Sequence, residues 1–286
     1  MVVTGLLFVL VTALVKYLGP RIPAAEAAFL RYALGLVLLI PMLKSFRETS
    51  YSPSILKLFG LRGITHSLGV ALWFYAMARI PIADVTAMNY MTPVYVTLGA
   101  ALFLGEKLAF RRIMAVLVAM IGALIILRPG FREIGIGHIA MVFTAIFFAC
   151  SYLIAKRTSG LVSPSVVVVM LSLSVTVGLF PLALMDWVMP TLQETFILFL
   201  VACVATLGHY TMTLAFAAAP VTVTQPVTFL QLVWAVSLGV VFFGEPIDPW
   251  VIAGGCVIMS AISFITWREA VLARKLRTPT MNATKV

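Results

Sequence analysis

The sequence predicts an all-α polytopic membrane protein with ten transmembrane helices in two inverted five-helix repeats. Three observations predict it: the composition, an internal repeat and the distribution of basic residues. Of the 286 residues, 62% are hydrophobic and only 10% are charged, and the mean hydropathy is +1.11. A water-soluble chain of this size needs a charged shell around its core, and too few charges are present to form one. We therefore expect the chain to reside in a lipid bilayer.

The internal repeat is clearest in two segments that are near copies of each other. Residues 81–106 read PIADVTAMNYMTPVYVTLGAALFLGE, and residues 220–245 read PVTVTQPVTFLQLVWAVSLGVVFFGE. Both open on proline and close on Gly-Glu, and they align without a gap at an offset of 139, which indicates a duplicated unit. Each apolar run is long enough to cross the roughly 30 Å hydrocarbon core at about 1.5 Å per residue.

The other spans are predicted by apolar runs between charged residues, glycines and prolines. In the first half the expected spans are 2–18, 23–43, 60–79, 82–104 and 111–127. The first run begins at Met1 without a preceding basic region or a cleavage site, so we expect a membrane span there and not a removable signal.

In the second half the expected spans are 136–155, 164–185, 195–218, 221–243 and 250–268. The connection from 218 to 221 is very short, which predicts antiparallel neighbouring helices. Because each repeat has an odd number of helices, the second copy enters the membrane upside down, as in many secondary transporters. The predicted units are a first repeat at 1–130, a second, inverted repeat at 131–268, and a basic cytoplasmic tail without regular structure at 269–286.

Basic residues are unevenly divided between the two sides of this topology. The side with both termini holds fourteen: Lys44, Arg47, Lys57, Arg62, Lys107, Arg111, Arg112, Lys156, Arg157, Arg268, Arg274, Lys275, Arg277 and Lys285. The other side holds five: Lys16, Arg21, Arg79, Arg128 and Arg132. Basic residues mark the cytoplasmic side, so both termini are predicted to be cytoplasmic. The net charge of +10 then reflects topology, and no nucleic-acid partner is expected.

Several motifs resemble one transporter family. They are Pro81, Pro93 and Gly105-Glu106 in one half, Pro220 and Gly244-Glu245 in the other, and Phe29-Leu30-Arg31-Tyr32 near the start of the second span. On these residues the whole chain resembles the EamA-type branch of the drug/metabolite transporter superfamily, and within it the bacterial exporters of aromatic amino acids. The resemblance implies a central cavity lined by the first, third, fourth, sixth, eighth and ninth spans.

A polar stripe runs along both near-copied helices. It comprises Thr86, Asn89 and Thr92 in the fourth span and Gln225, Thr228 and Gln231 in the ninth. A spacing of three keeps each trio on one helix face, and Thr92 and Gln231 lie about 16 Å deep at about 1.5 Å per residue. Amides are costly facing lipid, so we predict that they face a cavity; hydrogen bonding between helices is the alternative.

Other candidate cavity residues lie at similar depths. They are Trp73, Tyr75, Tyr95, Trp234, and His209 with Thr213 on the same helix face. Aromatic walls with a few polar groups are typical of small-molecule sites, while ordinary helix packing is the alternative for each residue. Pro93 and Pro226 interrupt their spans and are candidate hinges, and Glu106 and Glu245 are candidate gate residues. Arg31 is expected to have a structural role.

The predicted function is export of amino acids, preferentially large neutral or aromatic ones, across the bacterial inner membrane by alternating access. The spans contain no HxxxH, DxD or serine–histidine pattern, so an enzyme, a metal and a cofactor are not expected. His209 is the only ionisable residue expected in the cavity, which favours a neutral or zwitterionic substrate over a nucleotide sugar, the main rival beside a drug or nucleobase. A receptor or scaffold is the alternative of a different class, and a monomer is expected.

Overall fold

The computed structural model describes residues 2–104, 110–128, 133–158, 161–218 and 230–277, and every regular element within these ranges is a helix. The helices of the first half are α1 (Val2–Leu18), α2 (Ala24–Gly35), η1 (Leu36–Met42), α3 (Leu43–Glu48), α4 (Pro53–Met77), α5 (Ile82–Asn89), α6 (Met91–Leu104) and α7 (Phe110–Leu127). Those of the second half are α8 (Ile136–Thr158), α9 (Pro164–Met185), α10 (Leu192–Ala218), α12 (Leu230–Phe243) and α13 (Pro249–Arg277).

The helix boundaries follow from local chemistry. Ser52 caps α4, because its hydroxyl accepts a hydrogen bond from the Ile55 amide at 3.4 Å, and Pro53 occupies the first helical position, where no amide donor is needed. Gly19 and Gly244 follow α1 and α12 with φ of 74° and 61°. Only glycine adopts these angles without strain, so both glycines end their helices.

Prolines divide two of the predicted spans. The span predicted at 23–43 is α2 followed by the 3₁₀ helix η1, which contains Pro41. The span predicted at 82–104 is α5 and α6, separated at Tyr90, whose amide bonds to the Ala87 carbonyl at 3.3 Å in a tighter turn. Pro93 has no amide to donate to the carbonyl of Asn89, so a continuous helix loses a hydrogen bond there.

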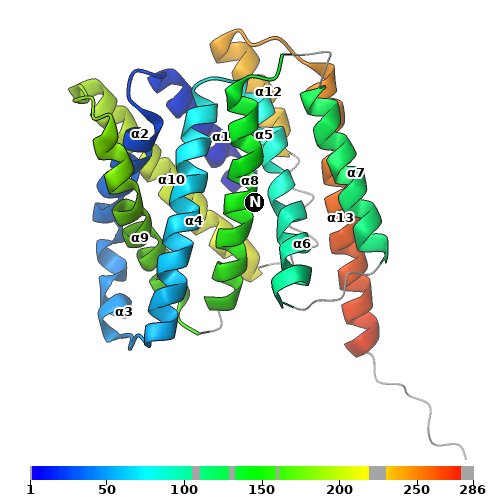
Figure 1. Cartoon of the computed structure of the whole chain (residues 1–286), viewed down its shortest axis with the longest axis horizontal. Helices are drawn as coiled ribbons and strands as arrows, with labels where there is room; N and C mark the ends of the chain where they lie inside the picture. Colours follow the sequence, from blue (N-terminus) through cyan, green and yellow to red (C-terminus); the bar gives the residue numbers. More distant parts are fainter. Residues whose placement is uncertain (1, 105–109, 129–132, 159–160, 219–229, 278–286) are drawn as a thin grey trace, which may run out of the picture.

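The helices pack side by side in one bundle (Figure 1). In this bundle α4 packs on α8 and α9, α1 packs on α10 and α12, and α2 packs on α9 and α10. The pair α7 and α13 lies at one edge of Figure 1, and α5 contacts α12. Gly122 and Gly254 bring α7 and α13 close together, since a Cβ added at Gly122 would lie 2.8 Å from the Gly254 carbonyl oxygen. Small residues allow such close approach in membrane helices.

Five described helical stretches are long and apolar enough to cross a membrane: Ala24–Met42, Pro53–Met77, Ile136–Ala155, Ser165–Met185 and Leu192–Thr211. Shorter apolar helices lie at Val2–Leu18, Ile113–Leu127, Gln231–Phe243 and Pro249–Phe264. Large apolar side chains on the outside, such as Val177 and Phe242, are more than 70% exposed, which suits a lipid environment. The all-helical membrane fold is as predicted, and ten spans remain a prediction with which these helices are compatible.

Two predicted boundaries differ from the structure. Helix α13 continues to Arg277, where the sequence predicts an irregular tail after residue 268. Helix α4 begins at Pro53, seven residues before the predicted span, so Arg62 lies well inside the helix and not near its start, and it is 6% exposed. Arg62 is therefore not one of the loop charges that set the topology.

Candidate substrate site

His66 lies at the centre of a polar contact between three helices. Its Nε2 lies 3.1 Å from the Tyr32 hydroxyl on α2, and its Nδ1 lies 3.1 Å from the Ser151 hydroxyl on α8. His66 is 3% exposed. Both ring nitrogens therefore have hydroxyl partners, and the imidazole joins α2, α4 and α8.

An aromatic wall, formed by Trp73, Phe148 and Tyr152, lies beside this histidine on α4 and α8. The Phe148 ring centroid lies 5.0 Å from that of His66, 6.0 Å from that of Trp73 and 6.1 Å from that of Tyr152, which stacks on it. Trp73 Nε1 is buried and has no hydrogen-bond partner in the described part of the chain. The wall is a continuous π surface with one unused donor.

Part of the wall and a histidine on a third helix keep accessible surface. Tyr152 is 41% exposed. His209 on α10 is partly exposed, and its ring contacts Phe8 edge-on at a centroid distance of 5.1 Å. A solute can therefore reach both side chains.

Two arginines lie near the same interior. The Arg31 guanidinium lies 4.0 Å from the centroid of the Tyr32 ring, and Arg62 Nη1 donates to the Val167 carbonyl at 3.3 Å. Arg62 precedes His66 by one turn of α4, and the Tyr32 ring beside Arg31 carries the hydroxyl that contacts His66. His209 lies within electrostatic range of both arginines. We call Arg31, Arg62, His66 and His209 the basic cluster. The sequence predicts His209 alone as the ionisable residue of the cavity, and the structure adds three buried basic residues as candidates.

The polar stripe of the fourth span lies at the break between α5 and α6. Thr92 Oγ1 donates to Asn89 Oδ1 at 3.3 Å, so these two residues bond to each other across the break. Thr92 is 4% exposed and Thr86 is equally buried, whereas Asn89 is partly exposed. The pair stabilises the interrupted backbone, and discontinuous helices of this kind are common in transporter binding sites.

The other predicted cavity residues make different contacts. Gln231 faces α1. A Cβ added at Gly5, which belongs to α1, would lie 3.5 Å from the Cβ of Gln231. Trp234 packs against a small core of Val9, Ala13, Ile82 and Ala235. Tyr75 lies under the Arg79 guanidinium at 3.7 Å near the end of α4, and Tyr95 packs against the main core.

The structure does not describe the side chains of five predicted site residues. Glu106, Gln225 and Pro226 lie outside the described residues. Pro93 on α6 and Thr213 on α10 have described backbones only.

Glu245, a predicted gate residue, bonds to two other helices. Its carboxylate pairs with Lys16 at 2.5 Å and accepts a hydrogen bond from the Ile82 amide, the first of α5, at 3.0 Å. Lys16 also donates to the Ile80 carbonyl at 2.9 Å. These bonds connect the ends of α1, α5 and α12.

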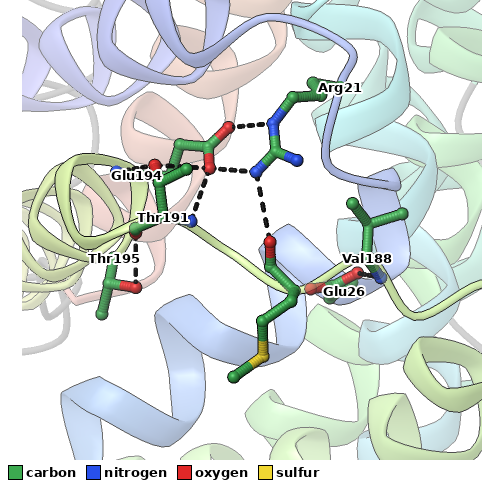
Figure 2. Close-up of polar contacts among 7 residues, drawn as sticks. Arg21, Glu26, Val188, Thr191, Glu194 and Thr195 are labelled. Carbon is green, nitrogen blue, oxygen red and sulfur yellow. Dashed lines mark hydrogen bonds and ion pairs between the residues drawn. The ribbon is translucent and has the colours of Figure 1, made fainter.

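Further ion pairs gather at the same end of the bundle, where α1 meets α2 and α9 meets α10. Figure 2 shows Arg21 paired with Glu194, which also accepts from the Thr191 amide at 2.8 Å, and Glu26 accepting from the Val188 amide at 2.9 Å. Two more pairs lie there: Arg128 with Asp248, and His138 with Asp84 at 2.9 Å. We call this end the latched end; a cavity of about 300 Å³ lies there, lined in part by Pro81, Asp84, Arg128, Glu245 and Asp248.

Sequence reasoning missed several of these residues. Phe148, Tyr152 and Ser151 carry no signal in an apolar span, because aromatic and small residues are frequent in membrane helices. Arg62 and His66 do carry one, since a charge and a histidine four residues apart fall on one helix face. Both residues lie within the span predicted at 60–79, so this spacing could have been read from the sequence.

An apolar exterior around a polar and aromatic interior is the arrangement of a multi-pass membrane transporter. The chain belongs to the EamA-like transporter family, whose model matches residues 1–128 and again residues 135–267.

Similar proteins have several named substrates. A "Riboflavin transporter" of Vibrio cholerae is 32% identical over 97% of this chain and 95% of its own. A "Pseudopaline exporter CntI" of Pseudomonas aeruginosa is 30% identical over 91% of this chain and 92% of its own. An "S-adenosylmethionine uptake transporter" of Rickettsia bellii is 26% identical over 89% and 87%. These names confirm the family and do not support the narrower resemblance to aromatic amino-acid exporters.

A solved crystal structure has the same fold. Its TM-score is 0.60 over 96% of this chain and 98% of its own, at 17% identity.

Proposed function

We propose that the protein carries an aromatic metabolite across the bacterial inner membrane by alternating access. The observation that carries the proposal is the aromatic wall of Trp73, Phe148 and Tyr152, of which Tyr152 is 41% exposed. An apolar, aromatic surface with a few placed polar groups binds small organic solutes well. His66 and Asn89 supply polar groups near this surface and near the helix break.

The first substrate class is the large neutral or aromatic amino acids, moved outward. Their ring matches the aromatic wall, and the hydroxyls and amides nearby suit an ammonium and a carboxylate. Riboflavin is the second candidate, because two relatives named riboflavin transporters are each 32% identical to this chain over at least 96% of its length. Its flavin ring needs the same kind of wall.

The proposed mechanism rests on ten helices in two inverted repeats. Helix contacts support it. If each helix is replaced by its counterpart in the other half, a helix contact becomes another contact that is also present. The contact of α4 with α8 corresponds to that of α10 with α1, and α4 with α9 corresponds to α10 with α2. Likewise α6 with α8 corresponds to α12 with α1. Two halves related in this way can exchange their conformations and so open the interior to either side.

The latched end is proposed to be the periplasmic gate. With cytoplasmic termini, the connection of α12 to α13 faces the periplasm, and the bonds of Glu245 to Lys16 and to the Ile82 amide close that side. Opening requires that these bonds break together. No carboxylate of the latched end lies in the middle of a span, where it could carry a proton across the membrane. Facilitated diffusion is therefore the simplest mechanism.

Flux into liposomes containing the purified protein tests the proposed function. The panel is phenylalanine, tryptophan, riboflavin, uridine-diphosphate glucose and a nucleobase, each with and without a pH gradient. We expect flux of phenylalanine, tryptophan or riboflavin above that of empty liposomes. Flux of the nucleotide sugar or nucleobase alone would contradict the aromatic class, and no flux at all would favour a receptor or scaffold.

A further inference from the structure

We propose that the basic cluster of Arg31, Arg62, His66 and His209 binds an anionic group, a carboxylate or a phosphate, of the transported solute. This inference rests on the proposed function, since it requires that a solute reaches the interior of the bundle. It narrows the substrate to an aromatic solute with at least one negatively charged group.

The burial of two arginines is the first observation. Arg31 and Arg62 are each 6% exposed, and both lie within apolar stretches long enough to span the bilayer. An uncompensated charge is costly at such positions, and intramembrane charges usually pair with another group or mark a substrate path.

The contacts within the protein compensate these charges only in part. Arg62 has a single carbonyl acceptor, that of Val167, and Arg31 lies over the Tyr32 ring. The Nε atoms of both arginines are buried without a hydrogen-bond partner in the ranges that the structure describes. Across those ranges neither guanidinium forms an ion pair with a carboxylate. The structure therefore leaves strong donors unused.

The convergence of the cluster is the second observation. Its members come from α2, α4 and α10. The Tyr32 ring lies 4.0 Å from the Arg31 guanidinium, its hydroxyl lies 3.1 Å from His66 Nε2, and Arg62 precedes His66 by one turn of α4. Tyr152 is 41% exposed. A guanidinium presents a planar fork of donors that fits carboxylate and phosphate oxygens. An anionic group held there would leave an attached ring next to Phe148 and Tyr152.

Matched pairs of probes test the proposal by equilibrium dialysis with the purified full chain in detergent. Phenylacetate and phenylacetamide differ in one negative charge on the same ring. Flavin mononucleotide and riboflavin differ in one phosphate. We expect the parent protein to bind the anionic member of at least one pair at least tenfold more tightly. A preference in the first pair identifies a carboxylate site, and a preference in the second identifies a phosphate site.

The variants Arg31→Gln and Arg62→Gln are expected to reduce this preference to less than threefold, while Arg31→Lys and Arg62→Lys keep part of it. Arg157→Gln is the matched control, because Arg157 is an exposed arginine on α8, and it should keep the full preference. If the Gln variants do not fold, the test rests on the binding preference of the parent protein and of the Lys variants for the anionic probe. The proposal is overturned if the parent binds both members of each pair equally, or if folded Gln variants keep the full preference.

The same liposomes separate this proposal from the proposed function. Flux of riboflavin with no anion preference in binding would overturn the anionic site and leave the transporter in place. An anion preference that depends on Arg62, without flux of any solute in the panel, would support the site and contradict the proposed function.

Discussion

At the scale of single residues, neighbouring side chains hold the interior rings in fixed orientations. His66 has hydroxyl partners at both nitrogens, so its ring is held in one orientation and presents its face to Phe148. Trp73 holds its ring edge-on against the same phenylalanine, while its Nε1 remains unbonded within the described residues. Such side chains are pre-organised, which lowers the entropy cost of binding.

Replacing Trp73 or Phe148 by alanine should weaken transport of an aromatic solute. Loss of an aromatic contact costs about 1 kcal/mol beyond the buried area, or several-fold in affinity. We expect Trp73→Ala and Phe148→Ala to raise the KM for the solute about fivefold to tenfold, as measured by flux in liposomes. Trp267→Ala is the control, because Trp267 is 58% exposed on α13. An unchanged KM in both interior variants would argue against the aromatic wall.

The amide and indole on α12 provide a second test at this scale. Gln231 and Trp234 are predicted cavity residues, yet they face α1 and a small core. If they bind the solute, Gln231→Ala and Trp234→Ala should each reduce phenylalanine flux without lowering the thermal midpoint. If they only pack, Trp234→Ala should lower the midpoint, since large-to-small core changes cost about 3–5 kcal/mol. Thermal unfolding and flux of the same preparations separate the two roles.

At the scale of helices, breaks and close approaches determine which residues meet. The division of α5 from α6 at Tyr90 brings the hydroxyl of Thr92 to the amide of Asn89. The close contact of α7 with α13 depends on Gly122 and Gly254, whose carbonyls would each lie within 3 Å of a Cβ on the other glycine. Helix packing in lipid lacks the driving force of water exclusion, so such shape matching is decisive.

Gly122→Leu should therefore destabilise the protein. A Cβ at Gly122 would lie 2.7 Å from Ile258 Cγ1 and 2.8 Å from the Gly254 carbonyl, so α7 and α13 must separate. Overpacking of this kind costs about 1–3 kcal/mol, and we expect a lower thermal midpoint in detergent. Gly60→Ala is the matched control, because a Cβ at Gly60 would meet no atom within 4 Å. Equal midpoints for the two variants would show that the glycine contact is unimportant.

At the scale of the whole molecule, the ion pairs found among the described residues gather at one end of the bundle. The latched end joins helices from both halves, since Lys16 belongs to α1 and Glu245 follows α12, and Arg21 and Glu194 are likewise far apart in the chain. Under the proposed mechanism, each bond across the halves stabilises the conformation in which that end is closed. The latched end can thus set the ratio of closed to open states.

Glu245→Gln should shift this ratio toward the open state. Neutralising the carboxylate removes the ion pair with Lys16 and weakens the bond to the Ile82 amide, together about 1–3 kcal/mol. In a background without native cysteines, Ala83→Cys reports on this end, because Ala83 lines its cavity. We expect Glu245→Gln and Lys16→Gln to increase the labelling of this cysteine by a membrane-impermeant maleimide several-fold. Glu48→Gln, an exposed residue on α3, should leave labelling unchanged, and no increase in either gate variant would refute the gate.

The orientation of the whole chain has a direct test. With Arg62 assigned to the interior, the predicted cytoplasmic side still has thirteen basic residues against five, and basic loops stay in the cytoplasm. A phosphatase that is active only outside the cytoplasm, fused after Lys285, should show no activity. Strong activity of that fusion would invert the predicted topology and place the latched end in the cytoplasm.

The sequence by itself determines the environment, the duplication and the family of this protein. A chain that is 62% hydrophobic cannot remain in water, and the two Gly-Glu segments at a fixed offset are visible without any structure. These properties depend on composition and local order, which hydropathy and alignment register directly.

Only the tertiary structure decides which residues form the interior. Tyr32, His66 and Ser151 meet from three helices, and the partner of Glu245 is Lys16, more than two hundred residues away. Arg62 is an interior charge because α4 turns its side chain toward the other helices, where it is 6% exposed and donates to the Val167 carbonyl of α9. Each case depends on helix rotation and helix neighbours, and these are set by packing between distant segments, which leaves no local pattern in the chain.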